Sequence, residues 1–359
     1  MKKCTFIRFF ALLCTLLLTC ATAVAEPKVF LPEEYTKNGT LPVYYASERD
    51  LLPHVDPAFF NQSGIVETKT GKNDYHAVTF ADGAILEWDK NSLNYNTHDG
   101  FGEIVHEDAM TGEKYTELRP KPDIANAAAS LAGWMHYGWP KTGEVFTLQS
   151  ETLPGITLEQ AKAKTDQLLA MLGLDGYVCE TALDMDMSRI REMGDRWNAL
   201  IDEGYMLNCH RLDYSAATQK DEGYMLLCNR YGSTGDVDGF FYVNVYVTSE
   251  GFAWINLHDR YAAGDICSTP ASLVSWESVA EALPREMAES RLGFRLEEIY
   301  SVRLAWCPVR AADAKDGMVL TPAWILDIRV SSDEPGEEGD GYYAIFNAVD
   351  GKLINGNWI

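Results

Sequence analysis

The sequence predicts an α+β protein, with a β-rich N-terminal region followed by two units in which helices pack on antiparallel sheets. Short runs rich in Tyr, Val and Phe are separated by turn signals such as Asp82-Gly83. Amphipathic helical patterns follow them. The order of helix and then strands occurs twice, at 157–258 and at 275–359, which favours helices covering one face of each sheet.

The first 25 residues have the pattern of a secretory signal. Basic residues precede an apolar stretch at 9–20, and small residues stand at positions 23 and 25. We therefore expect cleavage between Ala25 and Glu26 and a secreted, extracytoplasmic chain. A retained membrane anchor and a lipoprotein attached through Cys20 are the alternatives. No apolar run long enough for an integral membrane span follows this segment.

Length and charge limit what the rest of the chain can be. The 359 residues carry 53 acidic and 30 basic side chains, a formal net charge of −23. Such acidity excludes nucleic acid as a partner. An apolar share of 47% is too high for a disordered chain. We divide the chain into a signal peptide (1–25), a β-rich N-terminal region (26–150), a first α+β unit (151–270) and a second α+β unit (271–359).

The N-terminal region contains two predicted hairpins. Asp82-Gly83 separates the runs 74–80 and 84–88, and glycine accepts the positive φ that a tight turn needs. The runs 102–106 and 114–118 form a second pair. An Ala-rich segment at 124–134 is expected to be helical.

Both later units begin with a predicted helix. Thr157 and Gln160 form a capping box, and Gly173 ends the first helix. A second amphipathic helix is predicted at 188–202, before a four-stranded meander at 202–209, 221–228, 240–248 and 252–257. In the last unit, a helix at 275–291, expected to kink at Pro284, precedes strands at 294–309, 320–330, 342–348 and 352–354.

Two motifs of the second unit resemble those of a known family. A Pro-Ala-Trp strand at 322–324 precedes a strand that ends in Asn-Ala-x-Asp-Gly-Lys-Leu at 347–353. This pattern is similar to the PepSY-like modules of secreted bacterial proteins, which occur in peptidase propeptides and in envelope proteins that regulate sensor kinases. The usual module has Asp at the position of Asn347 and often Thr at that of Asp350.

The resemblance covers about 157–359 and is clearest over 275–359. The chain as a whole is similar to uncharacterised secreted proteins of gut Clostridia. The resemblance implies small helix-on-sheet units, and it provides no catalytic residues to carry over.

Five cysteines lie beyond the signal, and none belongs to a C-x-x-C pair, so a zinc site built on paired cysteines is not expected. If 204–214 and 222–232 form a hairpin, Cys209 and Cys228 face each other and are candidates for a disulfide. The alternative is two reduced, buried thiols.

No catalytic, cofactor-binding or metal-binding residues are predicted. The chain has no H-E-x-x-H or G-x-S-x-G motif and no Gly-rich phosphate loop. His98 and His106 lie near several carboxylates, which fits a metal site or a solvated loop. Trp134 and Trp139 fit either sugar stacking or core packing.

The first hypothesis for function is therefore a secreted or envelope-attached, non-catalytic binding or regulatory protein. Its partner would be an extracytoplasmic protein or a cell-wall component, reached through sheet edges and loops. A secreted hydrolase that uses paired carboxylates is the alternative, and a pocket with two carboxyl groups about 5–10 Å apart would favour it. A propeptide-like peptidase inhibitor is a third possibility, suggested only by the resemblance.

Overall fold

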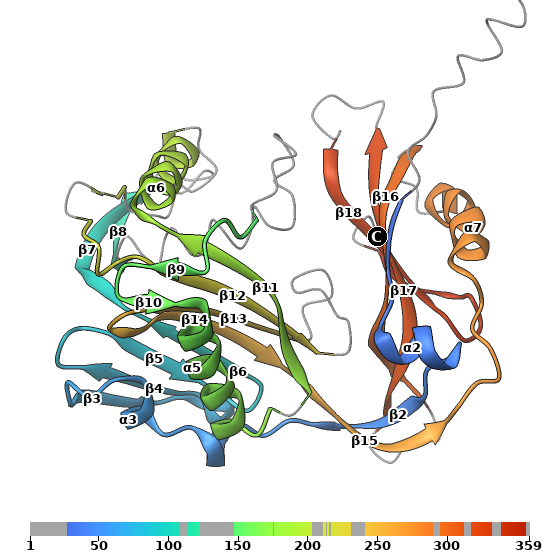
Figure 1. Ribbon diagram of the computed structural model, residues 1–359, viewed down its shortest axis with the longest axis horizontal. Coiled ribbons are helices and arrows are strands. Elements are labelled where there is room, and N and C mark those ends of the chain that lie inside the picture. The colour runs from blue at the N-terminus through green and yellow to red at the C-terminus, as the bar shows by residue number, and fades with distance from the viewer. Residues whose placement is uncertain are drawn as a thin grey trace, which may run out of the picture.

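The protein is built around two sheets, which stand side by side in the computed structural model (Figure 1). The structure describes residues 27–107, 114–122, 147–174, 176–202, 211–212, 214, 217–230, 241–289, 295–311, 317–331 and 339–356. One sheet has eight strands and the other has seven, with helices packed on both. The protein is thus of mixed α and β structure and rich in sheet. Among the described residues, no helix is long and apolar enough to cross a membrane.

The eight-stranded sheet is antiparallel throughout, in the order β11-β12-β13-β14-β6-β5-β4-β3. Its N-terminal strands are β3 (Ile65–Thr70), β4 (His76–Phe80), β5 (Ile85–Trp88) and β6 (Ser92–Asn96). Its later strands are β11 (Tyr177–Met185), β12 (Gly223–Arg230), β13 (Phe241–Thr248) and β14 (Gly251–Asp259). The predicted Asp82-Gly83 hairpin is confirmed between β4 and β5, with Gly83 at φ 95°.

Two helices cover opposite faces of this sheet, which corrects the expectation of helices on one face. The β12 residues Tyr224, Leu226 and Cys228 pack with helix α5 (Leu158–Met171). Their neighbours Met225 and Leu227 pack with helix α6 (Met187–Asp202). Because successive strand residues point to opposite faces, a strand covered on both sides must be apolar at nearly every position.

The start of α5 is as predicted. The Thr157 side chain accepts a hydrogen bond from the Gln160 backbone N–H at 3.2 Å, and the Gln160 side chain accepts one from the Thr157 backbone N–H at 2.8 Å. Gly173, just past the helix, adopts φ 66°, which an L side chain resists.

The seven-stranded sheet combines the start and the end of the described chain. Strand β1 (Lys28–Phe30) pairs in parallel with β16 (Arg295–Arg310), after which β17 (Met318–Ser331), β18 (Gly339–Asn347) and β19 (Leu353–Gly356) follow in antiparallel order. Strand β2 (Val43–Glu48) pairs with β17 and with β15 (Tyr261–Ser268). Helix α7 (Trp276–Glu289), which contains Pro284, packs on one face. The 350–351 turn signal is confirmed between β18 and β19, with Gly351 at φ 74°.

Residues of the Pro-Ala-Trp and Asn-Ala-x-Asp-Gly-Lys-Leu motifs have packing roles in this sheet. The indole of Trp324 is buried and donates a hydrogen bond to the Val274 carbonyl at 2.7 Å, which ties the approach to α7 onto β17. The Asn347 side chain accepts a hydrogen bond from the Val349 backbone N–H at 2.9 Å, in the turn before β19. Both contacts fix the helix and the last hairpin on the sheet.

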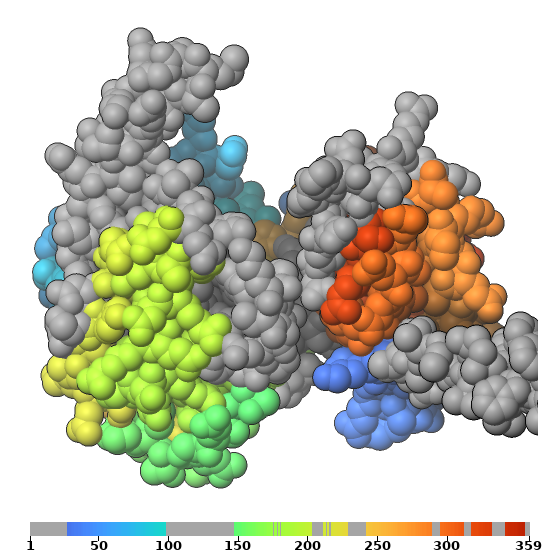
Figure 2. Space-filling view, turned by 90° about the horizontal axis from the view of Figure 1, so that it is seen from above, coloured from blue at the N-terminus to red at the C-terminus, as the bar shows by residue number. Residues whose placement is uncertain are grey.

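The described chain passes between the two sheets along the ribbon formed by β2 and β15. From β1 in the seven-stranded sheet it leaves through β2, builds the eight-stranded sheet, and returns through β15 (Figure 1). In the space-filling view the two parts form separate lobes (Figure 2). Strand pairing therefore crosses the predicted boundaries: residues 65–96 share a sheet with 177–259, and residues 28–48 join the sheet of 295–356.

The remaining described elements are shorter. The predicted second hairpin is confirmed as β7 (His98–Glu107) paired with β8 (Lys114–Pro122). The others are α2 (Glu33–Asn38), the 3-10 turns Leu52–His54 and Lys72–Asp74, α3 (Pro57–Phe60), β9 (Thr152–Leu153) and β10 (Ile156–Thr157). The predicted helix at 124–134 lies outside the described residues, as does nearly all of the strand at 202–209.

The disulfide joins Cys179 to Cys228, across neighbouring strands β11 and β12. This corrects the predicted Cys209–Cys228 bridge, because Cys228 cannot bond to both residues. The prediction failed because β11 was not expected, and β11 is the strand that pairs with β12 here. Cys209 lies outside the described residues.

One histidine gives the eight-stranded sheet a pH dependence. His258 stacks on Tyr242, and burial lowers the pKa of its imidazole, an effect that Asp89 opposes. The folded chain therefore takes up this proton less readily than the unfolded chain, whose histidines titrate near pH 6.5. The contribution of His258 to the free energy of unfolding is therefore fully present above pH 6.5 and is lost as the pH falls below it.

We expect His258→Gln to lose less unfolding free energy than the wild type when the pH is lowered from 7.5 to 5.0, as measured by urea unfolding. An equal loss in the two proteins would contradict this expectation.

Candidate functional site

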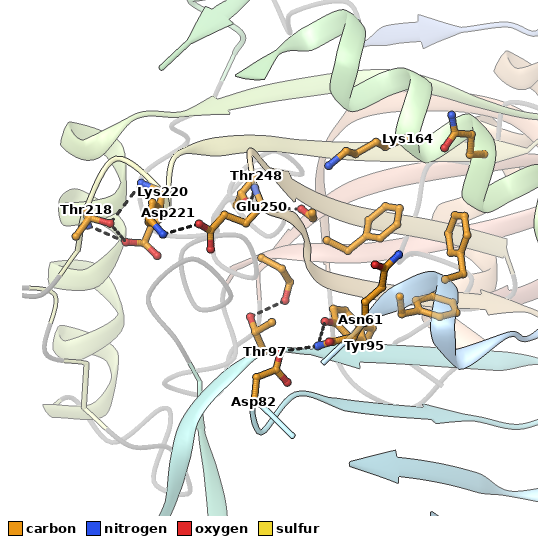
Figure 3. Close-up of a pocket in the computed structure, with 17 residues that line it drawn as sticks. Asn61, Asp82, Tyr95, Thr97, Lys164, Thr218, Lys220, Asp221, Thr248 and Glu250 are labelled. Carbon is orange, nitrogen blue, oxygen red and sulfur yellow. Dashed lines mark hydrogen bonds and ion pairs between the residues drawn. The ribbon is translucent and has the colours of Figure 1, made fainter. Parts of the chain in front are cut away.

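A cavity of about 690 Å³ lies at one end of the eight-stranded sheet. Its walls come from α3, α5, the turn between β4 and β5, the end of β6, the 218–221 turn and the turn between β13 and β14 (Figure 3). Pockets for small ligands commonly measure about 300–1,000 Å³, so this one has the right size. Its position at strand ends exposes loop residues without interrupting the core.

Aromatic rings form the apolar part of the cavity. Phe59 and Phe252 lie 5.9 Å apart between ring centroids, and Phe60 contacts both of them and Tyr95. Phe60 and Tyr95 are buried, whereas Phe59 and Phe252 are only partly buried. The exposed parts of these two rings offer a ligand a flat apolar surface.

Two of the three carboxylates in the cavity lie in one charged cluster with Lys220. Glu250 accepts a hydrogen bond from the Lys220 ammonium at 2.6 Å, and this contact raises the pKa of Lys220, with a smaller contribution from Asp221. Asp221 accepts hydrogen bonds from the backbone N–H and the hydroxyl of Thr218, at 2.7 and 3.2 Å. Lys220, Glu250 and Asp221 thus form a local charged group of their own.

Two further charges in the cavity have no counter-ion among the described residues. Asp82 accepts hydrogen bonds from the Asn61 amide at 2.8 Å and from the Ala84 backbone N–H at 3.2 Å, both neutral donors. Lys164 is partly buried, and neither it nor Asp82 forms an ion pair within the part of the chain that the structure describes. The two enter the cavity from opposite sides, Lys164 from α5 and Asp82 from the turn between β4 and β5 (Figure 3).

The residues considered as sites from the sequence are not among those that line the cavity in the described part of the chain. Ala25, Glu26, Trp134 and Trp139 are outside the described residues. His98 and His106 occupy β7, whose pairing with β8 is described but whose side chains are not. Among the described residues, no group of three or more His, Cys, Asp or Glu side chains could hold a metal ion.

Two carboxylates outside the cavity, those of Asp184 and Asp186, have structural roles. Asp184 forms an ion pair with Arg189 at 2.9 Å, and both side chains are at least nine-tenths buried. Asp186 accepts a hydrogen bond from the Arg189 backbone N–H at 2.9 Å and so satisfies the start of α6. These residues hold α6 against β11 and leave the cavity as the better candidate site.

Comparisons with known proteins bear on the fold alone. No protein-family model matches the chain, and no curated protein matches it. An uncharacterised protein of Eubacterium rectale, known from a crystal structure, is similar in structure with a TM-score of 0.50 and 11% sequence identity. The match covers 88% of this chain and 86% of that one, so the likeness extends over both sheets.

No sequence pattern indicates the cavity, because its residues come from separate parts of the chain. Asp82 lies in a predicted hairpin turn and Lys164 lies within the helix predicted to begin at Thr157, and neither pattern indicates a ligand site. Two local signals were available: the consecutive aromatic residues Phe59-Phe60, and Phe252 directly after the Gly251 turn. Neither signal shows that the aromatic residues meet.

Proposed function

We propose that the protein is a secreted or envelope-attached binding or regulatory protein and that the cavity binds its ligand. The observation that carries this proposal is the pairing of partly exposed Phe59 and Phe252 rings with uncompensated polar groups in one cavity of ligand size. An apolar surface beside a few converging polar groups is the usual composition of a binding pocket.

The disulfide supports the extracytoplasmic location. Bridges such as Cys179–Cys228 persist in oxidising compartments and are rare in the cytosol. The proposal includes export through the signal at 1–25 and a mature chain that begins at Glu26. In the alternative, a lipid attached at Cys20 would hold the same extracytoplasmic chain at the membrane. The partner would be a wall component or another extracytoplasmic protein.

The second unit is included in the proposal as a PepSY-like module. Helix α7 followed by β16 to β19 in consecutive order is a helix-on-sheet arrangement. The same order of a helix and four consecutive antiparallel strands occurs in α5 and β11 to β14, with α6 inserted after β11. This supports the finer description of two related units.

The hydrolase alternative is less well supported by the cavity. The cavity does bring together three carboxylates, those of Asp82, Asp221 and Glu250. Each of them, however, already accepts hydrogen bonds from local donors, and Glu250 is paired with Lys220. A glycosidase needs one carboxyl group that keeps a proton to donate to the leaving group. The contacts found here are those of acceptors.

The test is binding of soluble wall fragments, disaccharide peptides released from Gram-positive cell wall by a muramidase, measured by calorimetry on the mature protein. We expect binding that Phe252→Ala weakens about five- to tenfold, because the ligand loses an aromatic contact. Phe30→Ala is the matched control, since Phe30 is an exposed aromatic residue on the other sheet.

Thermal unfolding of both variants shows whether each still folds. Absence of binding by the folded wild type, or equal weakening by the two substitutions, would contradict the proposed site.

A further inference from the structure

The two uncompensated charges of the cavity carry information about its ligand. A carboxylate and an ammonium inside one cavity would be expected to pair with each other if they were within reach. Lys164 and Asp82 do not pair, and they enter from opposite sides (Figure 3). Each is therefore available to a group of opposite charge on a ligand that lies between them.

The charges that line the cavity limit which kinds of ligand can bind there. A simple anion would be attracted by Lys164, and by Lys220 where Glu250 does not already neutralise it, but would be repelled by the three carboxylates. A simple cation would be attracted by Asp82 but would be repelled by Lys164 and Lys220. A ligand with an anionic group at one end and a cationic group at the other satisfies both, and because its net charge is near zero, the −23 charge of the chain does not repel it.

The hydrogen-bonding capacity of Asp82 permits such a ligand. An ionised carboxylate has about four acceptor sites, and Asn61 and Ala84 use one site on each oxygen of Asp82. The residue is exposed, so an ammonium group can approach the remaining sites. Lys164 has three donors and no described acceptor.

Building on the proposed function, we infer that the ligand is a short zwitterionic peptide with an apolar side chain. Its terminal carboxylate binds Lys164, its terminal ammonium binds Asp82, and its side chain packs on Phe59 and Phe252. An extended peptide spans roughly 3.5 Å per residue, and a cavity of about 690 Å³ accommodates about two to four residues.

The experiment uses three peptides of increasing length as probes: Gly-Phe, Gly-Phe-Gly and Gly-Gly-Phe-Gly. Each is tested free, N-acetylated and C-amidated, by calorimetry on the mature full chain. We expect one of the three peptides, the one whose length matches the span between Lys164 and Asp82, to bind most tightly, and to do so in its free form. Acetylation and amidation should each weaken that binding by at least about tenfold, since each removes a hydrogen-bonded charge.

Two isosteric or near-isosteric variants assign each end of the peptide. Lys164→Gln should lower the affinity for the free peptide about tenfold, and this variant should bind the free and C-amidated forms equally. Asp82→Asn should also lower the affinity for the free peptide about tenfold, and it should bind the free and N-acetylated forms equally. Lys162→Gln and Asp166→Asn are charge-matched controls on the exposed surface of α5 and should leave both preferences unchanged.

The outcomes separate this inference from the proposal on which it rests. If the wild type binds blocked and free peptides equally, or if Lys164→Gln keeps the preference for the free acid, the inference is wrong. If no peptide binds while wall fragments still bind in a manner sensitive to Phe252, the inference is wrong and the proposed site stands. If neither kind of probe binds, both are wrong.

Discussion

Replacing Arg49 by methionine is expected to destabilise the protein by about 3–5 kcal/mol, because it removes the guanidinium that pairs with the buried carboxylate of Asp259. Two guanidinium nitrogens of Arg49 lie 3.0 and 3.1 Å from Asp259 Oδ2, and the Asp259 side chain is fully buried. A third nitrogen donates to the Gly173 carbonyl at the end of α5, at 3.3 Å. The substitution therefore loosens the junction where the ribbon enters the eight-stranded sheet.

Urea unfolding followed by tryptophan fluorescence measures this effect. Lys37→Met is the matched control, because the Lys37–Glu33 pair is exposed and exposed pairs contribute at most about 1 kcal/mol. A similar loss for the two variants would mean that burial does not set the cost at Arg49.

Removing the Cys179–Cys228 bridge by a double alanine substitution is expected to cost about 4 kcal/mol. The two residues are 49 apart in the sequence, and a loop of that size, which contains α6, gains this much conformational freedom in the unfolded chain. Cys307→Ala is the control, because it removes a buried sulfur that belongs to no bridge. Cys307→Ala should lose clearly less unfolding free energy than the double alanine variant, as measured by urea unfolding.

Peptide mapping without reduction tests the connectivity directly. The expected product joins the peptides that contain Cys179 and Cys228. A product that joins Cys228 to Cys209 would instead restore the pairing that the sequence predicted and overturn the present one.

Local elements could be read from the sequence because their causes lie within a few residues. The Asp82-Gly83 hairpin needs only a glycine at positive φ between two strand-forming runs. The capping box spans the four residues from Thr157 to Gln160, and the face of α6 follows from helical periodicity. The structure contains all three features where they were expected.

The cavity could not be predicted in the same way. Asp82, Lys164 and Phe252 are separated by more than eighty residues in each case, and their proximity depends on which strands share a sheet. The disulfide prediction failed for a related reason, since it assumed the wrong neighbour for β12. Strand pairing is a long-range choice, and several pairings fit the same local patterns.

The sequence by itself determined an acidic chain, its mixed α and β class, most of the strands and helices, and the hairpins closed by short turns. These depend on composition, periodicity and turn chemistry. Only the tertiary structure decided that the chain leaves one sheet, builds another and returns through β15, and that α5 and α6 cover opposite faces. The physical reason is that burial of apolar surface and completion of backbone hydrogen bonds act between segments far apart in sequence, where no local pattern specifies the partner.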